Sequence, residues 1–361
     1  MGFLNGLYGE DIRAAAKARL PWERLAGRNI LIVGATGLLG KVLVDILMYK
    51  NERDGLGCHV YASGRSAERA KRRLCGRYFL DKNFRYLEWD VTGQVPEGLP
   101  EMDYILGMAG NTHPRAYSVE PIETILTTVY GTKNLLDICR KQGRGRFVFL
   151  SSVEIYGENR GDVELFEEHY LGVLDSNTLR AGYPEGKRCG ESLCQAYRFQ
   201  AGVDCVVARL PRVFGPTLWE EDSKAVSQFI HKALEHEDIV LKSDGSQHYS
   251  FLYAADAITG LLAVMLSGST GEAYNVASEG NDATLREMAE IAAGVAGTKV
   301  VYGCPDEKER AGYSTATVAR LDGTRIGKLG WKARYRATEA LERTIQIMEE
   351  NVRLGGGEVW R

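Results

Sequence analysis

The sequence predicts an α/β fold, namely a Rossmann doubly wound parallel sheet followed by a smaller C-terminal α/β lobe. Three observations lead to this prediction. Short β-branched runs alternate with amphipathic helical stretches up to about residue 212, which is the order of a parallel sheet with helices on both faces. A glycine-rich turn, GATGLLG, follows the first of these runs. After residue 213 the apolar runs become shorter and the helical stretches dominate.

Each element of the fold follows from its local pattern of apolar residues. In the first half, strands are expected at 29–34, 58–63, 84–90, 103–110, 146–152 and 204–210, and helices at 38–50, the basic stretch SAERAKRRL, 119–142 and 183–201. In the second half, helices are expected at AVSQFIHKALEHE, AADAITGLLAVML and TLREMAEIAAGVAG, with the short strands DIVLK, EAYNV and TKVVYG between them.

The chain is therefore expected to have three parts. Residues 1–27 form a helical extension that packs on the domain. Residues 28–212 form a dinucleotide-binding domain, in which the helix at 183–201 carries the candidate catalytic pair. Residues 213–361 form a lobe that binds substrate and covers the active edge of the sheet.

The composition does not point to several classes of function. A formal net charge of −3 gives no reason to expect a nucleic acid or a membrane surface as partner. No apolar run reaches the length of a membrane span, and the N-terminus lacks the apolar core of a signal peptide. The seven cysteines form no CxxC pair and have no histidine at metal-ligand spacing. We therefore expect reduced thiols, no metal and a cytoplasmic protein.

The glycine-rich turn predicts a dinucleotide site. Gly34, Gly37 and Gly40 have the spacing G-x-x-G-x-x-G between a strand and a helix. Glycine lets backbone N–H groups approach a pyrophosphate closely, and the helix N-terminus adds a favourable dipole. Thr36 and Leu38, inside the turn, are expected to contact the coenzyme. The alternative is a tight turn without a ligand, but the flanking strand and helix favour the dinucleotide.

The end of the second strand indicates which coenzyme binds. NAD-binding folds favour an acidic residue there, which accepts a hydrogen bond from the ribose 2′-hydroxyl. Here Ser63, Arg65 and Ser66 stand at this position, with Arg69 a turn later. A guanidinium suits a 2′-phosphate. NADP is therefore favoured over NAD, and the alternative is that the arginines form a solvated helix face.

Two further strand ends supply candidate coenzyme contacts. Asp90, which ends the third strand before Val91, can accept a hydrogen bond from the adenine amino group, or it can cap a turn. The segment GMAG ends the fourth strand. Its small residues would let the backbone pass close to the inner ribose and phosphates, so Met108, Ala109 and Gly110 are expected at the coenzyme.

Tyr183 and Lys187 stand four residues apart at the start of a helix, so their side chains share one face. Free tyrosine has a pKa of about 10, but a neighbouring ammonium favours the phenolate. Ser152, at the end of the fifth strand, is placed to hold a substrate hydroxyl while Tyr183 removes its proton. Lys187 is also expected to hold the nicotinamide ribose. The pattern Y-x-x-x-K alone is usually chance, but here it follows SSVEIYG inside a dinucleotide fold.

These motifs resemble those of the extended short-chain dehydrogenases/reductases, in particular the NAD(P)-dependent nucleotide-sugar epimerases, dehydratases and decarboxylases. The resemblance rests on GATGLLG, SSVEIYG, YPEGK and ARLPRVFGP, and covers about residues 28 to 350. The stretches YPEGKRCGESLCQAY and VSQFIHKAL are most similar to the UDP-glucuronate decarboxylases. The resemblance implies that Ser152, Tyr183 and Lys187 are catalytic and that a nucleotide sugar binds the C-terminal lobe. It also implies a homodimer paired through the helices near 119–142 and 183–201.

Glu154 matches the acidic residue of the family motif S-[ST]-x-E-h-Y-G. The resemblance implies that Glu154 is catalytic, in proton transfer or in positioning the sugar, and the alternative is an ion pair with a nearby arginine or lysine. Val153 stands where sugar 4,6-dehydratases generally need an aspartate that expels the 6-hydroxyl. Because valine cannot donate a proton, a dehydratase of that type is disfavoured.

Several residues depart from the family pattern where substrate should bind. Tyr249 replaces the arginine of G-x-Q-x-R that normally grips the sugar diphosphate. Arg212 stands for the asparagine of R-x-x-N-x-[YF]-G-P, Thr217 for the arginine that often follows it, and Thr128 for the asparagine usual before G-T-x-N-L-L. Either Arg212 restores the missing charge from another direction, or the substrate differs from a standard UDP-sugar. His113, just after the fourth strand, is a further candidate for donating to substrate.

The sequence supports three hypotheses about function. The first is an enzyme that oxidises a sugar hydroxyl, epimerises or decarboxylates the resulting ketone, and returns the hydride. The second is a net NADPH-dependent reductase of a nucleotide-linked keto sugar or polyol precursor. The third is a non-catalytic nucleotide-binding sensor, which the intact Ser152, Tyr183 and Lys187 disfavour.

Overall fold

A parallel sheet forms the centre of the protein. The computed structural model describes residues 6–112, 114–305, 307 and 316–353 of the 361-residue chain. Seven strands stand in the order β10-β6-β5-β4-β1-β2-β3, and every pair is parallel. Their bounds are β1 Asn29–Val33, β2 His59–Gly64, β3 Phe84–Glu88, β4 Tyr104–Gly107, β5 Arg146–Ser152, β6 Asp204–Leu210 and β10 Ala273–Asn275. The predicted α/β Rossmann architecture is confirmed.

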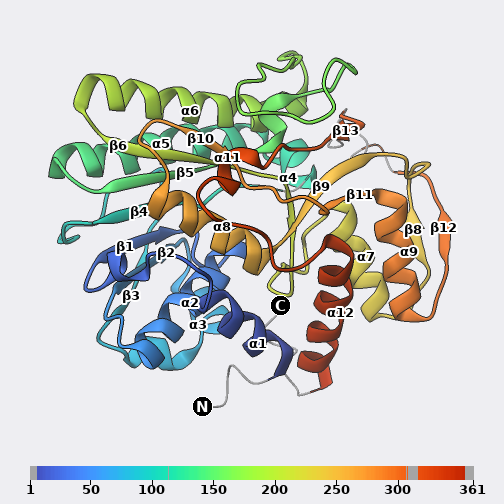
Figure 1. The fold of residues 1–361 in the computed structure, drawn as a ribbon, viewed down its shortest axis with the longest axis horizontal. Helices are drawn as coiled ribbons and strands as arrows, with labels where there is room; N and C mark the ends of the chain where they lie inside the picture. The colour runs from blue at the N-terminus through green and yellow to red at the C-terminus, as the bar shows by residue number, and fades with distance from the viewer. Residues whose placement is uncertain (1–5, 113, 306, 308–315, 354–361) are drawn as a thin grey trace.

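Helices cover both faces of this sheet (Figure 1). On one face lie α5 (Pro121–Gln142) and α6 (Gly182–Ala201), and on the other lie α2 (Leu38–Asp54) and α8 (Ala254–Ser267). Along β1, Ile30 and Ile32 belong to the apolar cluster that includes α2, whereas Leu31 and Val33 belong to the cluster that includes α5. This alternation arises because successive side chains of a strand point to opposite faces. Two short helices, α3 (Ala67–Arg73) and α4 (Pro114–Val119), follow β2 and β4.

The smaller lobe lies beside the sheet at the right of Figure 1. Its central strand is β9 (His248–Tyr253), which pairs with β7 (Arg212–Phe214), β11 and β13, while β8 pairs with β12. The remaining bounds are α7 Ala225–Leu234, β8 Ile239–Leu241, β11 Asp282–Thr284, α9 Leu285–Ala296, β12 Val300–Tyr302, β13 Val318–Ala319, α11 Thr324–Gly327 and α12 Ala337–Arg353.

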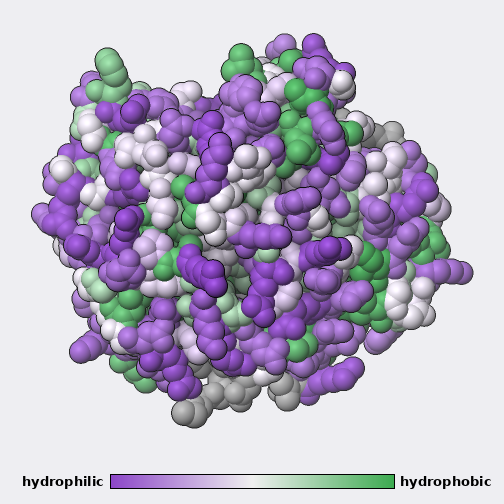
Figure 2. Space-filling view, in the orientation of Figure 1, coloured by the Kyte–Doolittle hydropathy of each residue, from purple (hydrophilic) through white to green (hydrophobic). Residues whose placement is uncertain are grey.

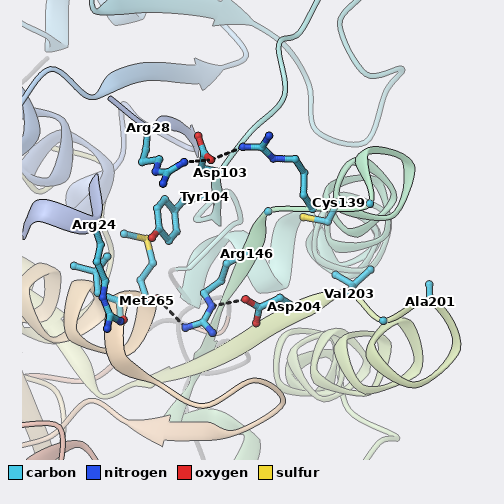
Figure 3. A pocket seen from close by; sticks show the side chains of 15 residues that line it. Arg24, Arg28, Asp103, Tyr104, Cys139, Arg146, Ala201, Val203, Asp204 and Met265 are labelled. Carbon is cyan, nitrogen blue, oxygen red and sulfur yellow. Dashed lines mark hydrogen bonds and ion pairs between the residues drawn. The ribbon is translucent and has the colours of Figure 1, made fainter. Parts of the chain in front are cut away.

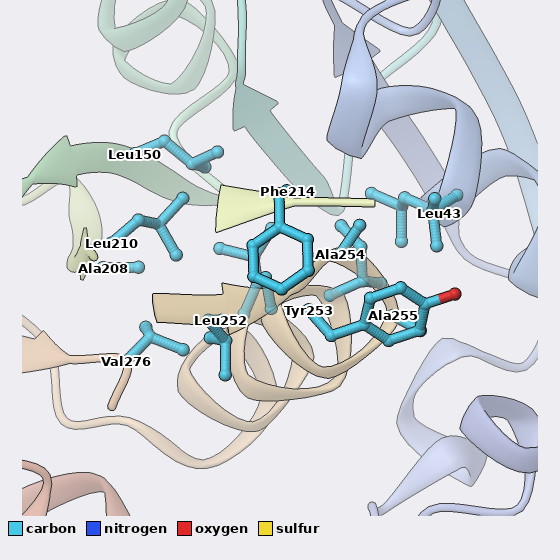
Figure 4. Packing of buried hydrophobic residues seen from close by; sticks show 14 of the residues in the cluster. Leu43, Leu150, Ala208, Leu210, Phe214, Leu252, Tyr253, Ala254, Ala255 and Val276 are labelled. Atoms are coloured by element: carbon cyan, nitrogen blue, oxygen red, sulfur yellow. The ribbon is translucent and has the colours of Figure 1, made fainter. Parts of the chain in front are cut away.

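Two elements after residue 213 belong to the large sheet rather than to the smaller lobe. The strand expected at EAYNV is β10, and it pairs with β6 at the sheet edge. Helix α8 packs against α2 and β6, so nearly all of its residues are buried. Figure 4 shows Phe214 and Tyr253 packed among Leu43 of α2 and Leu150 of β5. One apolar core therefore runs from the sheet into the smaller lobe, because these elements share it.

The extension before the sheet packs into the domain. Helix α1 (Gly6–Ala16) contacts α2, α8 and α12, and a 3₁₀ turn follows at Trp22–Leu25. The carboxylate of Asp11 is buried, and it accepts hydrogen bonds from the hydroxyls of Tyr253 (2.5 Å) and Tyr335 (2.8 Å) and from Nε of Arg343 (2.6 Å). Asp11 thereby joins the extension to α12 and to the end of β9.

The face of the molecule seen in Figure 2 is mainly hydrophilic. Figure 2 shows purple residues over most of one face, with hydrophobic residues scattered among them. Within the described residues, no helix combines the length and apolar character that crossing a membrane requires.

Candidate active site

A cleft opens at the carboxyl ends of β1, β4 and β5, where the smaller lobe faces the sheet. The strand order reverses between β1 and β4, which is where ligands bind in doubly wound folds. The cleft has a volume of about 590 Å³, within the range of roughly 300 to 1,000 Å³ typical of small-molecule sites. The candidate residues that line it are Gly34, Gly37, Leu38, Gly40, Arg65, Met108, Ala109, Gly110, Ser152, Glu154, Tyr183, Lys187, Arg212 and Tyr249.

The glycine turn has no room for side chains at two of its positions. Gly34 has a φ of +92°, and a Cβ there would lie 2.8 Å from the Met108 carbonyl carbon. A Cβ at Gly40 would lie 2.2 Å from the Gly34 carbonyl oxygen, so α2 approaches the turn closely. Gly37 precedes the first residue of α2, and no side chain caps the helix there. The first N–H groups of α2 can therefore serve an anion, and the turn fits the diphosphate of a dinucleotide.

The smaller lobe reaches across this turn. Thr217 donates a hydrogen bond from its hydroxyl to the Leu38 carbonyl at 2.7 Å, and its own carbonyl accepts one from Nη2 of Arg73. The guanidinium of Arg73 is buried, and Nε also donates to the Thr36 carbonyl (3.4 Å). Burial lowers the pKa of Arg73 to about 10. Thr217, which departs from the family pattern, thus fixes the smaller lobe to the start of α2.

Two arginines of the β2–α3 segment line the cleft. They are Arg65 and Arg69, and the guanidinium of Arg69 stacks on the ring of Trp219 with its Cζ 5.0 Å from the centroid. Ser66 does not line the cleft; its side chain caps α3 by accepting from the Arg69 backbone N–H. Ser63 is fully buried, and its hydroxyl has no hydrogen-bond partner among the described residues.

The other candidate coenzyme contacts divide into two groups. Met108, Ala109 and Gly110 line the cleft after β4. Asp90 lies outside the cleft lining, and its carboxylate accepts from the backbone N–H (2.9 Å) and the hydroxyl (2.7 Å) of Thr92. These hydrogen bonds lower the pKa of Asp90. Val91 is buried in the apolar cluster under α5. Asp90 therefore caps a turn, which is the second of the two alternatives that the sequence left open for it.

Tyr183, Ser152 and Lys187 all line the cleft. Tyr183 and Lys187 lie on the first turns of α6, and Ser152 ends β5. All three are buried, with exposed fractions of 7, 6 and 8 % in the order Tyr183, Lys187 and Ser152. Lys187 Nζ donates to the Leu150 carbonyl at 2.6 Å and lies 5.7 Å from the Tyr183 ring centroid. The lysine is thus fixed beside the phenol by a backbone carbonyl.

The electrostatics of this group differ from the simple expectation that Lys187 lowers the pKa of Tyr183. Burial raises the pKa of Tyr183 to about 12, and hydrogen bonding with Ser152 and with Tyr117 opposes this rise. Burial also lowers the pKa of Lys187 to about 8. The reason is that both groups lie in a region where an isolated charge is poorly solvated. Burial therefore outweighs the groups that lower the pKa of Tyr183, which are Ser152, the positive charge of Arg180 and Tyr117.

Glu154 lies between two arginines at the wall of the cleft. Its Oε2 is 2.8 Å from Nη2 of Arg180, and its Oε1 is 3.5 Å from Nη2 of Arg212. The Arg212 guanidinium stacks on Tyr249, with Cζ 3.5 Å from the ring centroid, and the Tyr249 hydroxyl donates to the Ala316 carbonyl. Nε and Nη1 of Arg180 and Nη1 of Arg212 are buried without hydrogen-bond partners among the described residues. These N–H groups can therefore bind an anionic oxygen atom.

Two residues of this cluster did not emerge from the sequence. Arg180 precedes Tyr183 by three residues. This spacing on a helical turn could have indicated that the two side chains are neighbours. Tyr117 lies on α4, and nothing in its local sequence indicates that its ring stacks on Tyr183, with centroids 4.8 Å apart. His113 lies outside the described residues.

A second hollow lies at the opposite edge of the sheet, at the amino ends of β1, β4, β5 and β6 (Figure 3). It has a volume of about 500 Å³. Several of its charges are paired with one another, as in Arg28 with Asp103 (3.3 Å) and Arg146 with Asp204 (2.8 Å). None of the candidate catalytic residues lines it, so the cleft at the carboxyl ends is the candidate active site.

The arrangement of glycine turn, tyrosine, lysine and serine agrees with a comparison with known protein families. Residues 30–277 match the model of the NAD dependent epimerase/dehydratase family. The chain belongs to this family. The family consists of enzymes, so the resemblance seen in the motifs is confirmed at this level.

One relative aligns with nearly the whole chain and another with about two thirds of it. UDP-glucuronic acid decarboxylase 3 of Arabidopsis thaliana is 30% identical over 330 residues, which are 90% of this chain and 89% of the relative. UDP-glucuronic acid decarboxylase 1 of Xenopus tropicalis is 33% identical over 240 residues, or 66% of this chain and 54% of the relative.

Solved structures share the fold. An epimerase, Mth375, from Methanothermobacter thermautotrophicus superposes with a TM-score of 0.77 at 21% identity, covering 92% of this chain and 95% of the other. UDP-glucuronic acid 4-epimerase from Bacillus cereus, solved with UDP-glucuronic acid and NAD, gives a TM-score of 0.75 at 19% identity, covering 89% and 99%.

Proposed function

We propose that this protein acts on a nucleotide-activated sugar by removing a hydride from a sugar hydroxyl carbon and later returning it. The observation that carries the proposal is that Tyr183, Ser152 and Lys187 line the same cleft as the glycine turn. The nicotinamide coenzyme, when bound, supplies the acceptor and donor of the hydride. Gly34, Gly37 and the first turn of α2 would hold its diphosphate.

The proposed chemistry assigns a separate task to each side chain. Tyr183 as phenolate takes the proton of the sugar hydroxyl, and Ser152 holds that hydroxyl in place. Lys187, fixed by the Leu150 carbonyl, holds the coenzyme ribose beside Tyr183. Tyr183 then returns a proton when the ketone is reduced again. The net reaction needs no external oxidant because the hydride is returned in each cycle.

The chemical class of the sugar is proposed from the cluster around Glu154. Arg180 and Arg212 hold buried N–H groups that lack partners among the described residues, and a carboxylate of the sugar would satisfy them. Two relatives are UDP-glucuronic acid decarboxylases. We therefore propose a nucleotide-linked uronic acid as substrate. Oxidation two carbons from the carboxylate gives a β-keto acid, which loses carbon dioxide; Glu154 positions the sugar ring. Epimerisation of the same ketone is the alternative.

The coenzyme preference is proposed from the arginines near β2. Arg65 and Arg69 line the cleft, and the Trp219 ring supports Arg69. No acidic residue stands at the end of β2, which ends in Ala62, Ser63 and Gly64. NADP is therefore proposed over NAD. The same arginines favour the second candidate function, a net reductase that consumes NADPH.

A homodimer is proposed through α5 and α6. Ile122, Leu126 and Tyr130 recur every four residues on α5 and are exposed by 64, 39 and 50 %, and Phe199 on α6 is exposed by 95 %. Such a stripe is apolar surface that a second copy would cover. Light scattering of wild type and of Ile122→Glu tests the dimer, because the variant should be a monomer.

A cytoplasmic location is proposed from the cysteines. They are free thiols, which supports this location.

The proposed function is tested by incubating the purified protein with UDP-glucuronic acid without added coenzyme. Mass spectrometry of the products should show loss of carbon dioxide, and Tyr183→Phe should give no product. Isomer formation without loss of mass would favour epimerisation. Stoichiometric consumption of added NADPH with a keto sugar would favour the reductase. If a panel of nucleotide uronic acids and keto sugars gives neither product nor coenzyme oxidation, the proposal fails.

A further inference from the structure

A strap of the smaller lobe forms one wall of the candidate coenzyme site. It comprises residues 215–224, which connect β7 to α7. Several strap residues line the same cleft as the glycine turn and the arginines near β2; they are Trp219, Glu221, Asp222, Ser223 and Lys224. A dinucleotide in the glycine turn would therefore lie against the strap.

The strap is attached to the beginning of α2 through Thr217. The Thr217 side chain is 1 % exposed, and its hydroxyl donates to the Leu38 carbonyl at 2.7 Å. Its own carbonyl accepts a hydrogen bond from Nη2 of Arg73, which belongs to α3 and is also 1 % exposed. One residue of the strap is thus held by two helices of the dinucleotide-binding domain.

The next attachment is the ring of Trp219. Two guanidinium groups of α3 lie against it, with Cζ of Arg73 at 4.0 Å and Cζ of Arg69 at 5.0 Å from the ring centroid. Cation–π contacts of this kind hold a ring and a guanidinium together. The strap is therefore bound to α3 by both its backbone and its tryptophan.

A third attachment joins the strap to α4. The backbone N–H of Arg115 donates to Oγ of Ser223 at 3.2 Å. Helices α2, α3 and α4 follow β1, β2 and β4, which are neighbours in the sheet and end at the glycine turn. The strap is thus fixed to all three elements around the candidate coenzyme site.

We propose that residues 215–224 retain the coenzyme, because the attachments at Thr217, Trp219 and Ser223 must open before a dinucleotide enters or leaves the glycine turn. This inference rests on the proposed function, which places the coenzyme there. A coenzyme enclosed in this way is regenerated in place, as the return of the hydride requires. A net reductase would instead have to open the strap in every cycle.

The attachments give the strap a kinetic signature. Each of them joins one protein group to another, so weakening it eases opening to the same extent with and without bound coenzyme. The association and dissociation rates should then rise together, and Kd should stay unchanged. A residue that binds the coenzyme directly would instead change the dissociation rate and Kd together.

The first test variant is Thr217→Val, which keeps the shape of the side chain and removes the hydroxyl donor. Thr217→Ser keeps the donor and is the conservative control. Thr344→Val controls for loss of a buried threonine hydroxyl elsewhere, since Thr344 is fully buried and donates to the Ala340 carbonyl on α12 at 2.7 Å. Stopped-flow fluorescence of the nicotinamide measures both rates, with NADPH and separately with NADH, and needs no sugar substrate.

The second test variant is Trp219→Leu, which removes the ring between the two arginines. Its rates are measured with NADH, so that an effect of Arg69 on a 2′-phosphate does not enter. Trp22→Leu is the control, because the Trp22 ring also contacts a cation, with Lys50 Nζ 4.7 Å from its centroid, but does not line the cleft.

Both rates should rise roughly fivefold in Thr217→Val, with Kd within about twofold of wild type, as loss of one hydrogen bond would produce. Trp219→Leu should behave alike, and the three controls should match wild type. Unchanged rates in both variants, or a faster dissociation that raises Kd by the same factor, would overturn the proposal while leaving the proposed function intact. A wild-type protein that binds neither NADPH nor NADH would overturn both.

Discussion

The guanidinium of Arg212 lies over the ring of Tyr249, with its Cζ 3.5 Å from the ring centroid. Both residues depart from the family pattern, and the structure places them in direct contact beside Glu154. A phenol in place of an arginine removes one cation, and Arg212 restores a cation at the same wall of the cleft. The two departures therefore form one unit, in which the tyrosine ring supports the arginine.

This unit predicts different effects for two substitutions of Tyr249. Tyr249→Leu removes the ring under Arg212, so KM for the nucleotide sugar should rise about tenfold, as loss of a cation–π contact of about 1 kcal/mol and of guanidinium order would produce. Tyr249→Phe keeps the ring and loses only the hydrogen bond to the Ala316 carbonyl. Its KM should stay within about twofold of wild type, with stability lower by about 1 kcal/mol. Equal KM values for the two variants would contradict the supporting role of the ring.

The glycine turn predicts that Gly40→Ala strongly weakens coenzyme binding. The new Cβ would lie 2.2 Å from the Gly34 carbonyl oxygen, so the turn must move away from α2. Fluorescence titration with NADPH should show binding at least about 100-fold weaker, since backbone donors of the turn are displaced. Gly294→Ala in α9 is the control, because a Cβ there meets no atom within 4 Å. That variant should bind normally and gain about 0.5 kcal/mol of stability.

The arginines near β2 predict a coenzyme-selective effect. Arg69→Ala should weaken NADPH binding by roughly 30-fold and NADH binding by less than about twofold, because only the 2′-phosphate needs the guanidinium. Arg72→Ala on the same helix is the control; the Arg72 side chain is 54 % exposed and pairs with Glu68. Titration of each variant with both coenzymes measures the ratio. Equal weakening of NADPH and NADH would show that Arg69 does not read the 2′-phosphate.

Burial of Lys187 predicts that protein stability changes with pH. Its pKa is about 8 in the folded protein against an ordinary value of 10.5. Between these two values the unfolded chain binds more protons, so the free energy of unfolding rises with pH by at most about 1.4 kcal/mol per pH unit. Lys187→Met should lack this rise. Urea unfolding of both proteins from pH 8 to 10.5 tests it, and parallel curves would contradict the prediction.

Local patterns in the sequence were enough for the sheet, the glycine turn and the position of Tyr183 relative to Lys187. Each of these depends on residues within one strand, turn or helix. The contacts of Tyr117 and Arg212 could not be predicted in this way, because they join elements that are far apart in the chain. The edge strand β10 was expected in the smaller lobe for the same reason: a short apolar run does not indicate which sheet it joins.

The central claim is that Tyr183 removes a proton from a nucleotide sugar while a hydride leaves the same sugar carbon. The most direct measurement is a rapid-mixing experiment in which coenzyme-loaded protein meets UDP-glucuronic acid and absorbance of the reduced nicotinamide is followed. The account predicts a transient rise in wild type and none in Tyr183→Phe, with equal coenzyme content in the two proteins. A rise of the same rate and amplitude in Tyr183→Phe would contradict it.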